Sequence, residues 1–370
     1  MDKITFSVDG TRKEVEGRVL HRFADGLVLQ GRDGQVYPIA KTDISNHDRD
    51  TAEFKPFTPA ELETELFKEF PKSNGFNVLK SGSTQKTKRY VIVYNTSRAY
   101  ADWAKKLFEQ LYDFYPKFWG RRGFELDKHE FPLVAVIFSN PDEFRRYAFE
   151  DAGIDTRSLG VAAYYNKHTN RMILCDLAGM EQYLSDQKRK LRRSQLAEFL
   201  ERKGAAENIA TIIHEATHQI GFNCGMHDRL APYPLWLCEG FAVLHEVPDR
   251  FSDTGWSKGL KVNDRHLPVL LRFMPVVRSA GPIETLIQTD APLRDPDTAV
   301  QSYALSWGLV FYLSQKRKNE FMNYVKRMGT KTVASPDSPE IRKKDFEECF
   351  GDDWAKLYRE MGAYLTSLPR

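Results

Sequence analysis

The chain of 370 residues lacks a long apolar segment and has little net charge. Its longest apolar stretch, Leu133–Phe138, is much shorter than the roughly 20 residues of a membrane-crossing helix, so we expect no membrane span. The 54 Lys and Arg residues nearly balance the 51 Asp and Glu residues. The formal charge of +3 predicts no general attraction to nucleic acid or to an anionic membrane.

Cysteine is also scarce: the chain has four, at positions 175, 224, 238 and 349, and no C-x-x-C pair. This number and spacing argue against a disulfide framework and against a thiolate zinc site. We expect buried thiols, which behave as small apolar side chains. A bridge between Cys224 and Cys238 stays open, because these two residues flank the motifs described below.

The N-terminus, M-D-K-I-T, lacks the apolar run of a secretory signal. A chain from which a leader had been removed would look the same. The location therefore stays open: secreted or periplasmic in that case, and cytoplasmic otherwise.

The first segment, residues 1–50, is rich in β-forming residues. Short runs of them alternate with Asp-Gly pairs at positions 9–10, 25–26 and 33–34. Such pairs between alternating strands are typical of hairpins, so the segment predicts a small barrel of about five strands. It ends P-I-A-K-T-D-I-S at residues 38–45. With its strands and turns, this ending resembles the small homology domain of endocytic adaptor proteins, which implies an SH3-like β-barrel with a protein ligand.

Residues 51–87 are rich in charge and proline, and we interpret them as a linker with one short helix over residues 59–67. Residues 88–370 form one larger predicted domain, in which strands alternate with helices before a mainly helical part begins near residue 179. The expected fold class is α+β, a mixed sheet with its helices followed by a helical half. The predicted strands and helices of the first part are Tyr90–Tyr94, residues 97–118, Leu133–Phe138, Pro141–Ala152, residues 160–165 and Arg171–Cys175.

The motif H-E-x-x-H lies within a predicted helix at His214, Glu215 and His218. Residues i and i+4 of a helix share one face, so both imidazoles can reach one zinc ion at about 2.0–2.1 Å from each nitrogen. Glu215 would then lie beside the open coordination position. There it can accept a proton from a water molecule whose pKa the zinc lowers towards about 7.

A glutamate with apolar neighbours follows 21 positions after His218, in P-L-W-L-C-E-G-F-A at residues 234–242. Those neighbours would bury Glu239 at the start of a helix. A buried carboxylate needs a cation as its partner. We therefore predict Glu239 as the third metal ligand.

The combination of H-E-x-x-H with the later L-W-L-x-E-G-x-A resembles the gluzincin zinc metallopeptidases, which include the aminopeptidase N family. Within that clan, the motifs H-E-A-T-H-Q, P-L-W-L-C-E-G and Y-A-L-S-W are most similar to a bacterial group of predicted peptidases. We extend the resemblance from about residue 89 to the C-terminus. It implies a zincin-like catalytic domain over residues 88–370 that hydrolyses a peptide or protein substrate.

The resemblance also implies a role for each matching residue. His214, His218 and Glu239 take the places of the zinc ligands, and Glu215 takes that of the general base. Tyr303, 64 positions after Glu239, matches a tyrosine that stabilises the oxyanion in aminopeptidase-like relatives. A tyrosine packed in a helix interface is the alternative for Tyr303.

The chain also departs from that family. No G-x-M-E-N element precedes His214, and the strand predicted over residues 160–165 has no glutamate that could hold a free substrate amine, which argues against an aminopeptidase. Val243 occupies the position four after Glu239 where thermolysin-like enzymes have an acidic residue. The carboxylate that orients a metal-bound histidine must therefore come from elsewhere or be absent.

Several other interpretations are open at this point. The metal site could persist in an inactive scaffold that binds a peptide or protein. Residues 227–229 could line a cleft or form a polar connecting loop. His245 and Glu246 could form a second metal site, although a capped helix end is favoured. The basic run K-R-K-L-R-R at residues 188–193 is interpreted as a solvated helix face rather than a nucleic-acid patch.

Overall fold

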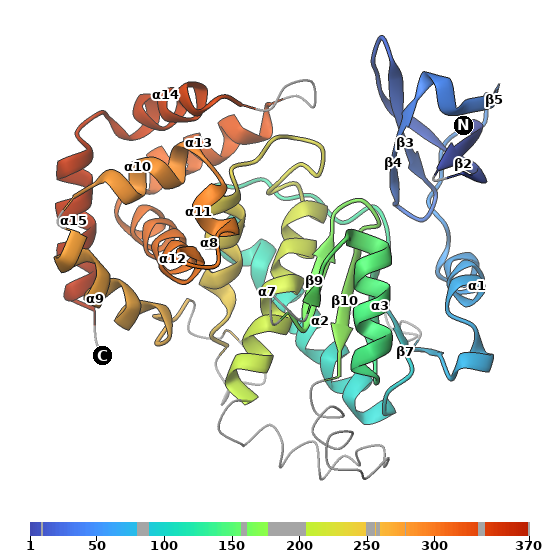
Figure 1. Ribbon diagram of the computed structural model, residues 1–370, viewed down its shortest axis with the longest axis horizontal. Coiled ribbons are helices and arrows are strands. Elements are labelled where there is room, and N and C mark those ends of the chain that lie inside the picture. The colour runs from blue at the N-terminus through green and yellow to red at the C-terminus, as the bar shows by residue number, and fades with distance from the viewer. Residues whose placement is uncertain are drawn as a thin grey trace. The chain divides into compact units, whose positions relative to one another are not determined.

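The computed structural model describes residues 1–8, 10–79, 89–156, 161–176, 205–248, 256, 260–277, 279–331 and 337–368. Strands occupy the blue-to-green part of the chain and helices its yellow-to-red part, so the expected α+β class is confirmed (Figure 1). The chain divides into two compact units. The first comprises residues 1–109 and 129–202, and the second comprises residues 110–128 and 203–370.

The first sheet of the first unit is antiparallel and open. Its strand order is β4-β3-β2-β1-β5. Alternate side chains of its strands form a small core of Ile4, Phe6, Leu27, Leu29 and Ile39. The strands are β1 (Asp2–Val8), β2 (Thr11–Arg22), β3 (Gly26–Gly31), β4 (Val36–Ala40) and β5 (Ile44–Arg49).

The predicted closed barrel is wrong. β5 pairs with β1, where Asp2 lies opposite Arg49, and β4 pairs with β3, where Gly26 lies opposite Ala40. β4 and β5 are therefore the two edges of the sheet, and within the described residues no pairing joins them. Asp-Gly turns and alternating residues predict neighbouring strands correctly, but they do not determine whether the first and last strands of a sheet meet.

The second sheet is mixed, as the sequence predicted. Its strand order is β6-β7-β8-β10-β9, with β7, β8 and β10 parallel and the two edge strands antiparallel. All residues of β7 and β8 are buried, which is expected of parallel strands covered on both faces. The strands are β6 (Asn77–Leu79), β7 (Tyr90–Tyr94), β8 (Leu133–Phe138), β9 (Ala163–Asn166) and β10 (Arg171–Cys175).

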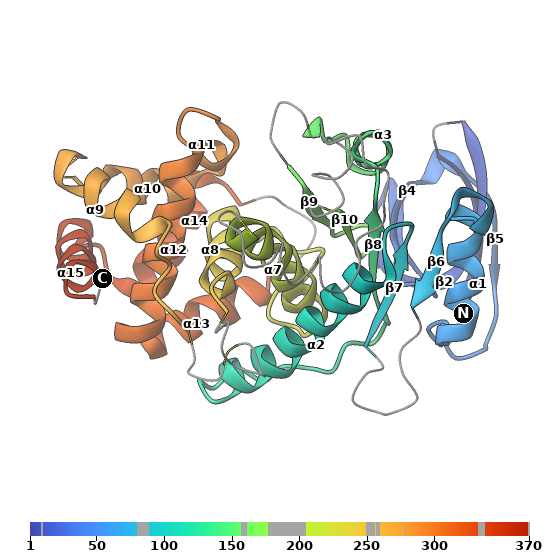
Figure 2. The same cartoon turned by 90° about the horizontal axis from the view of Figure 1, so that it is seen from below.

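The segment interpreted as a linker contributes to this second sheet. It contains helix α1 (Pro59–Glu69), which matches the short helix predicted there, and strand β6. Thr58 caps α1, because its hydroxyl accepts from the Glu61 N–H while the Glu61 carboxylate accepts from the Thr58 N–H. Leu62 and Leu66 of α1 are buried in the core of the second sheet. Helix α3 (Pro141–Ala152) also packs on this sheet, with the bounds that the sequence predicted (Figure 2).

The second unit is helical in its described part, as expected. Helix α2 (Arg98–Gly120) contributes its C-terminal half, from residue 110. The other helices are α7 (Ala205–Asn223), α8 (Leu235–His245), α9 (His266–Val277), α10 (Gly281–Gln288), α11 (Ala291–Arg294), α12 (Ala299–Lys316), α13 (Lys318–Gly329), α14 (Pro339–Phe350) and α15 (Trp354–Thr366). Helix α8 is apolar on all sides and buried from Trp236 to His245, so it forms the centre of this unit.

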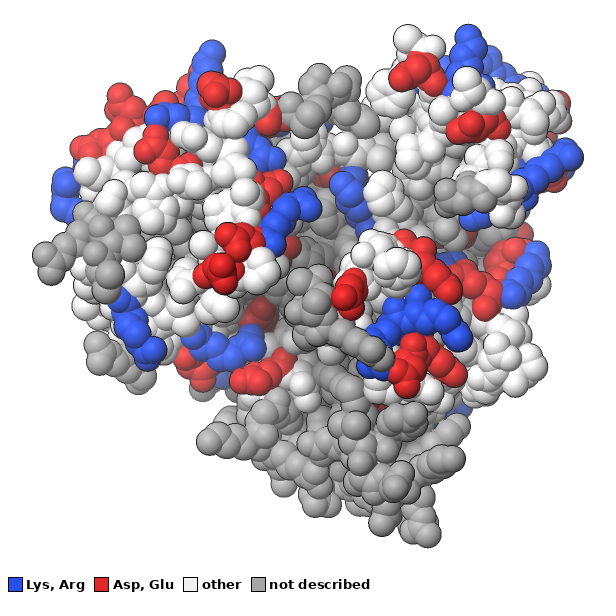
Figure 3. All heavy atoms as spheres, viewed as in Figure 1, with Lys and Arg blue, Asp and Glu red and all other residues white. Residues whose placement is uncertain are grey.

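Three further expectations can be compared with the structure. No described helix combines the length and the hydropathy needed to cross a bilayer. The four cysteines all lie within the described residues and none is in a disulfide, so Cys224 and Cys238 form no bridge; every one except Cys349 is buried. Basic and acidic side chains are interspersed on the face shown in Figure 3, in line with the balanced composition. The basic run at residues 188–193 lies outside the described residues.

Candidate metal centre

Two helices of the second unit bring the predicted ligands together. α7 carries His214 and His218 one turn apart, so both imidazoles leave the same face of the helix. α8 carries Glu239 in its second turn, slightly later than the helix start that the sequence suggested. The side chains of the three residues are only 10 to 12% exposed. A carboxylate and two imidazoles therefore lie together in one largely buried site.

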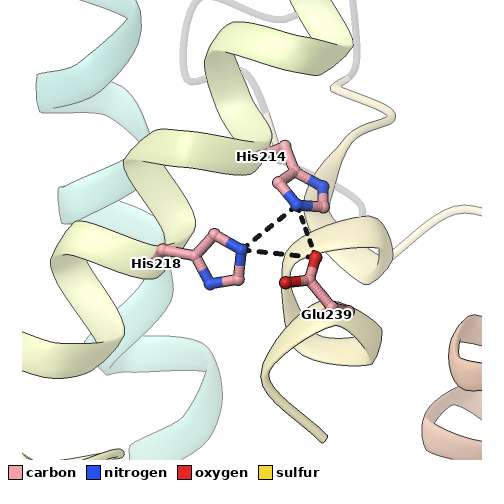
Figure 4. A group of neighbouring side chains, drawn as sticks. All are labelled: His214, His218 and Glu239. Atoms are coloured by element: carbon pink, nitrogen blue, oxygen red, sulfur yellow. Dashed lines mark hydrogen bonds and ion pairs between the residues drawn. The ribbon is translucent and has the colours of Figure 1, made fainter. Parts of the chain in front are cut away.

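The three side chains point toward one another (Figure 4). His214 Nε2 lies 2.9 Å from Glu239 Oε2 and 3.1 Å from His218 Nε2. His218 Nε2 lies 3.5 Å from the same Glu239 oxygen. Because three ligand atoms converge in this way, His214, His218 and Glu239 form a group that can hold a metal ion.

The electrostatics of the group favour a cation at its centre. Burial lowers the pKa of His214, but the hydrogen bonds with Glu239 and Glu246 and the charge of Glu215 outweigh it and raise this pKa well above its usual value. Burial raises the pKa of Glu239, but the charges and hydrogen bonds of His218 and His214 hold it well below its usual range. The glutamates that stabilise positive charge on His214 would equally stabilise a cation bound at this group.

The sequence did not predict the role of Glu246 as the partner of His214. His214 Nδ1 lies 2.8 Å from Glu246 Oε1, so the other ring nitrogen of this histidine already has a carboxylate partner. Glu246 is the C-cap of α8, as expected of a capped helix end, and its side chain is 6% exposed. Seven positions separate it from Glu239, which places both on one face of the helix two turns apart. That spacing allows Glu246 to meet His214, but it does not by itself distinguish Glu246 from the position four residues after Glu239, Val243.

The structure brings Tyr303 to the same group. Its ring centroid lies 6.3 Å from that of His214. The charge of Glu239, burial and the charge of Glu215 raise the pKa of the Tyr303 hydroxyl well above its usual value, so the phenol keeps its proton and can donate a hydrogen bond. Glu215 follows His214 on α7, and its charge raises the pKa of both His214 and Tyr303.

A close approach between α8 and α12 sets the position of Tyr303. A methyl group at Gly240 would lie 2.4 Å from Val310 Cγ2 and 2.7 Å from the carbonyl oxygen of Ser306. Only glycine fits at such a distance, because the obstacle includes the backbone of α12. Ser306 follows Tyr303 by about one helical turn. The glycine after Glu239 therefore allows the helix that carries the tyrosine to reach the helix that carries the glutamate.

Two histidines discussed above belong to the apolar core rather than to the ligand group. The His227 ring packs against Tyr233 and Phe241, and burial lowers its pKa to about 3. His245 is fully buried, its Nδ1 donates to the Phe241 carbonyl oxygen at 2.8 Å, and burial lowers its pKa to about 4. Among the described residues, the group of His214, His218 and Glu239 is the one with metal-ligand geometry.

The fold and the site thus define a mixed α+β protein with a His-His-Glu group that can hold a metal ion. In comparisons with known proteins, a family model described as "Protein of unknown function (DUF1570)" matches residues 208–334. The matched residues run from within α7 to beyond α13 and include His214, His218, Glu239, Glu215 and Tyr303. A search of curated proteins gave no match.

Proposed function

We propose that this protein is a zinc-dependent metallopeptidase with His214, His218 and Glu239 as zinc ligands. The observation that carries the proposal is the convergence of these three side chains on the helix pair that also holds Glu215. Four ligands at about 2.0–2.1 Å around a tetrahedral zinc ion lie about 3.3 Å from one another. The observed separations of 2.9, 3.1 and 3.5 Å bracket that value. Two imidazoles and one carboxylate are also a ligand set that zinc accepts, with a fourth position left open.

Each side chain near the zinc ligands would have one task in this reaction. A bound zinc ion would supply Lewis-acid activation of water and of the scissile carbonyl group. Glu215 would accept the proton of the attacking water at its carboxylate and pass it to the leaving nitrogen. The Tyr303 hydroxyl would donate a hydrogen bond to the oxygen on which negative charge develops. Glu246 would keep His214 in the tautomer that carries its proton on Nδ1, which leaves the lone pair of Nε2 for the metal.

The proposed substrate is a peptide or protein, which rests on the resemblance to gluzincins. The second sheet supports it in one respect: β9 is an edge strand that pairs with β10 on one side. A peptide can add to such an edge as a further strand. β9 contains no glutamate, so it offers no carboxylate for a free substrate amine, and the prediction against an aminopeptidase is kept.

The test separates metal binding from catalysis. Zinc content of the purified protein is measured by mass spectrometry, and cleavage is measured with a peptide library. We expect one zinc per chain, lost in Glu239→Ala and retained in Glu215→Gln, because Glu215 is not a ligand. Glu215→Gln should abolish cleavage, because a glutamine side chain cannot accept the proton of the attacking water. Glu207→Gln, an exposed glutamate on the same helix, is the matched control and should behave as wild type.

The outcomes decide between two functions. A protein without stoichiometric zinc would contradict the proposal. Zinc that is bound with no cleavage of any library peptide would favour an inactive scaffold that binds a peptide or protein. Cleavage that survives in Glu215→Gln would assign the proton transfer to another residue.

A further inference from the structure

The Glu246 carboxylate is held from two sides. Its Oε1 atom faces His214 Nδ1 at 2.8 Å. Its Oε2 atom accepts from Asn263 Nδ2 at 3.2 Å and is paired with the Arg265 guanidinium. Because the Glu246 side chain is only 6% exposed, a carboxylate oxygen without hydrogen-bond donors would destabilise the folded state. Asn263 and Arg265 supply those donors to Oε2.

The segment that precedes α9 is itself fixed. Asn263 is fully buried, and its Oδ1 accepts from the backbone N–H groups of Arg265 at 3.1 Å and His266 at 3.3 Å. This is the bonding of a helix cap, which ties the asparagine to the first turn of α9. Its Nδ2 also donates to the Val243 carbonyl oxygen at 3.3 Å, in the last turn of α8. Asn263 therefore joins the start of α9 to the end of α8, where Glu246 is the C-cap.

We infer that Asn263 and Arg265 are positioning residues of the metal centre, which act on His214 through Glu246. They fix Oε2, so that Oε1 is left for the imidazole. A carboxylate held there accepts from Nδ1–H and leaves the lone pair of Nε2 for the metal. Arginine suits the task because it stays charged and cannot give its proton to the carboxylate. This inference rests on the proposed zinc site, and it extends that site to the segment that precedes α9, which carries none of the proposed ligands.

The experiment measures the zinc dissociation constant by competition with a chromogenic chelator. We expect Arg265→Gln to bind zinc about tenfold more weakly, the lower end of the effect found for partners of metal-bound histidines. Arg272→Gln, at an exposed arginine of the adjoining helix α9, is the control and should match wild type. In a Glu246→Gln background, Arg265→Gln should have no further effect, because its route to His214 has been removed.

A second variant guards against loss of folding. Asn263→Ser keeps a helix-capping oxygen but removes the amide that donates to Glu246, and we expect zinc binding about threefold weaker or more. Circular dichroism of the metal-free proteins identifies any variant that fails to fold. A dissociation constant within about twofold of wild type in both Arg265→Gln and Asn263→Ser would overturn the inference, and so would an equal loss with and without Glu246. A wild-type protein that binds no zinc would instead refute the zinc site itself.

Discussion

The contact of Gly240 with α12 leads to a prediction for Gly240→Ala. The added methyl group would meet the Ser306 carbonyl oxygen at 2.7 Å and its carbon at 3.1 Å, whereas unstrained contacts need about 3.5 Å. Backbone atoms cannot rotate away, so α12 and α8 must separate by roughly 0.5–1 Å. Overpacking of this kind costs about 1–3 kcal/mol. Alanine recovers about 1 kcal/mol through its better helix propensity, so we expect a net loss of up to about 2 kcal/mol in the free energy of unfolding.

The same shift should impair catalysis more than metal binding. Of the two helices that separate, α12 carries Tyr303 and none of the proposed ligands, which lie on α7 and α8. A misplacement of about 1 Å can cost about 100-fold in rate. We therefore expect kcat to fall by roughly 10- to 100-fold while one zinc per chain is retained. Denaturant unfolding gives the stability, and steady-state cleavage of a substrate peptide gives kcat and KM.

Gly308→Ala is the matched control for this prediction. Gly308 lies within α12, on the helix that Gly240 contacts. A methyl group added at Gly308 would meet the end of the Leu270 side chain at 2.4 Å, and a side chain can move aside. This variant should therefore change stability by less than about 1 kcal/mol and leave kcat near the wild-type value. If Gly240→Ala were as stable and as active as wild type, or if both variants lost activity equally, the close approach of the two helices would not be what positions Tyr303.

Three further predictions concern single groups. Glu246→Gln should weaken zinc binding by roughly 10- to 100-fold in chelator competition, because His214 loses its charged partner. Tyr303→Phe should lower kcat by roughly 100- to 1000-fold with KM and zinc content unchanged, and unchanged kcat would return Tyr303 to a packing role. Burial lowers the pKa of His245 to about 4 in the folded state. Below about pH 6.5 this histidine therefore binds a proton in the unfolded state but stays neutral in the folded state until the pH reaches about 4. The free energy of unfolding should therefore fall by about 3 kcal/mol from pH 6.5 to pH 4. Denaturant unfolding of His245→Phe at the two pH values should show a decrease that is smaller by this amount.

The parts of the fold that could be predicted are those that neighbouring residues determine. β7 and β8 were predicted with their observed bounds, because buried parallel strands are short apolar runs bounded by polar residues. α3 was predicted because Asn140 caps its first turn and Gly153 ends it in the left-handed region, at φ 67°. Pairings between distant segments were not predictable in this way. The open edge between β4 and β5 and the place of β6 beside β7 depend on such pairings.

The same distinction runs through the metal centre. His214 and His218 could be placed together because four residues along a helix is a local relation, and Glu239 because its apolar neighbours indicate burial. Glu246 could not be chosen on such grounds. Positions four and seven after Glu239 both return to its face of α8, so helix geometry allows either to meet His214.

What separates the two positions is the packing of other helices on α8. Val243, at position four, is 1% exposed, and its carbonyl oxygen accepts from Asn263. Glu246, at position seven, lies where α8 ends and where Asn263 and Arg265 supply donors for a carboxylate. An acidic side chain at position 243 would lack those donors and would carry the cost of an unpaired buried charge. The position of Glu246, seven residues after Glu239, is therefore one at which the start of α9 stabilises a carboxylate beside His214.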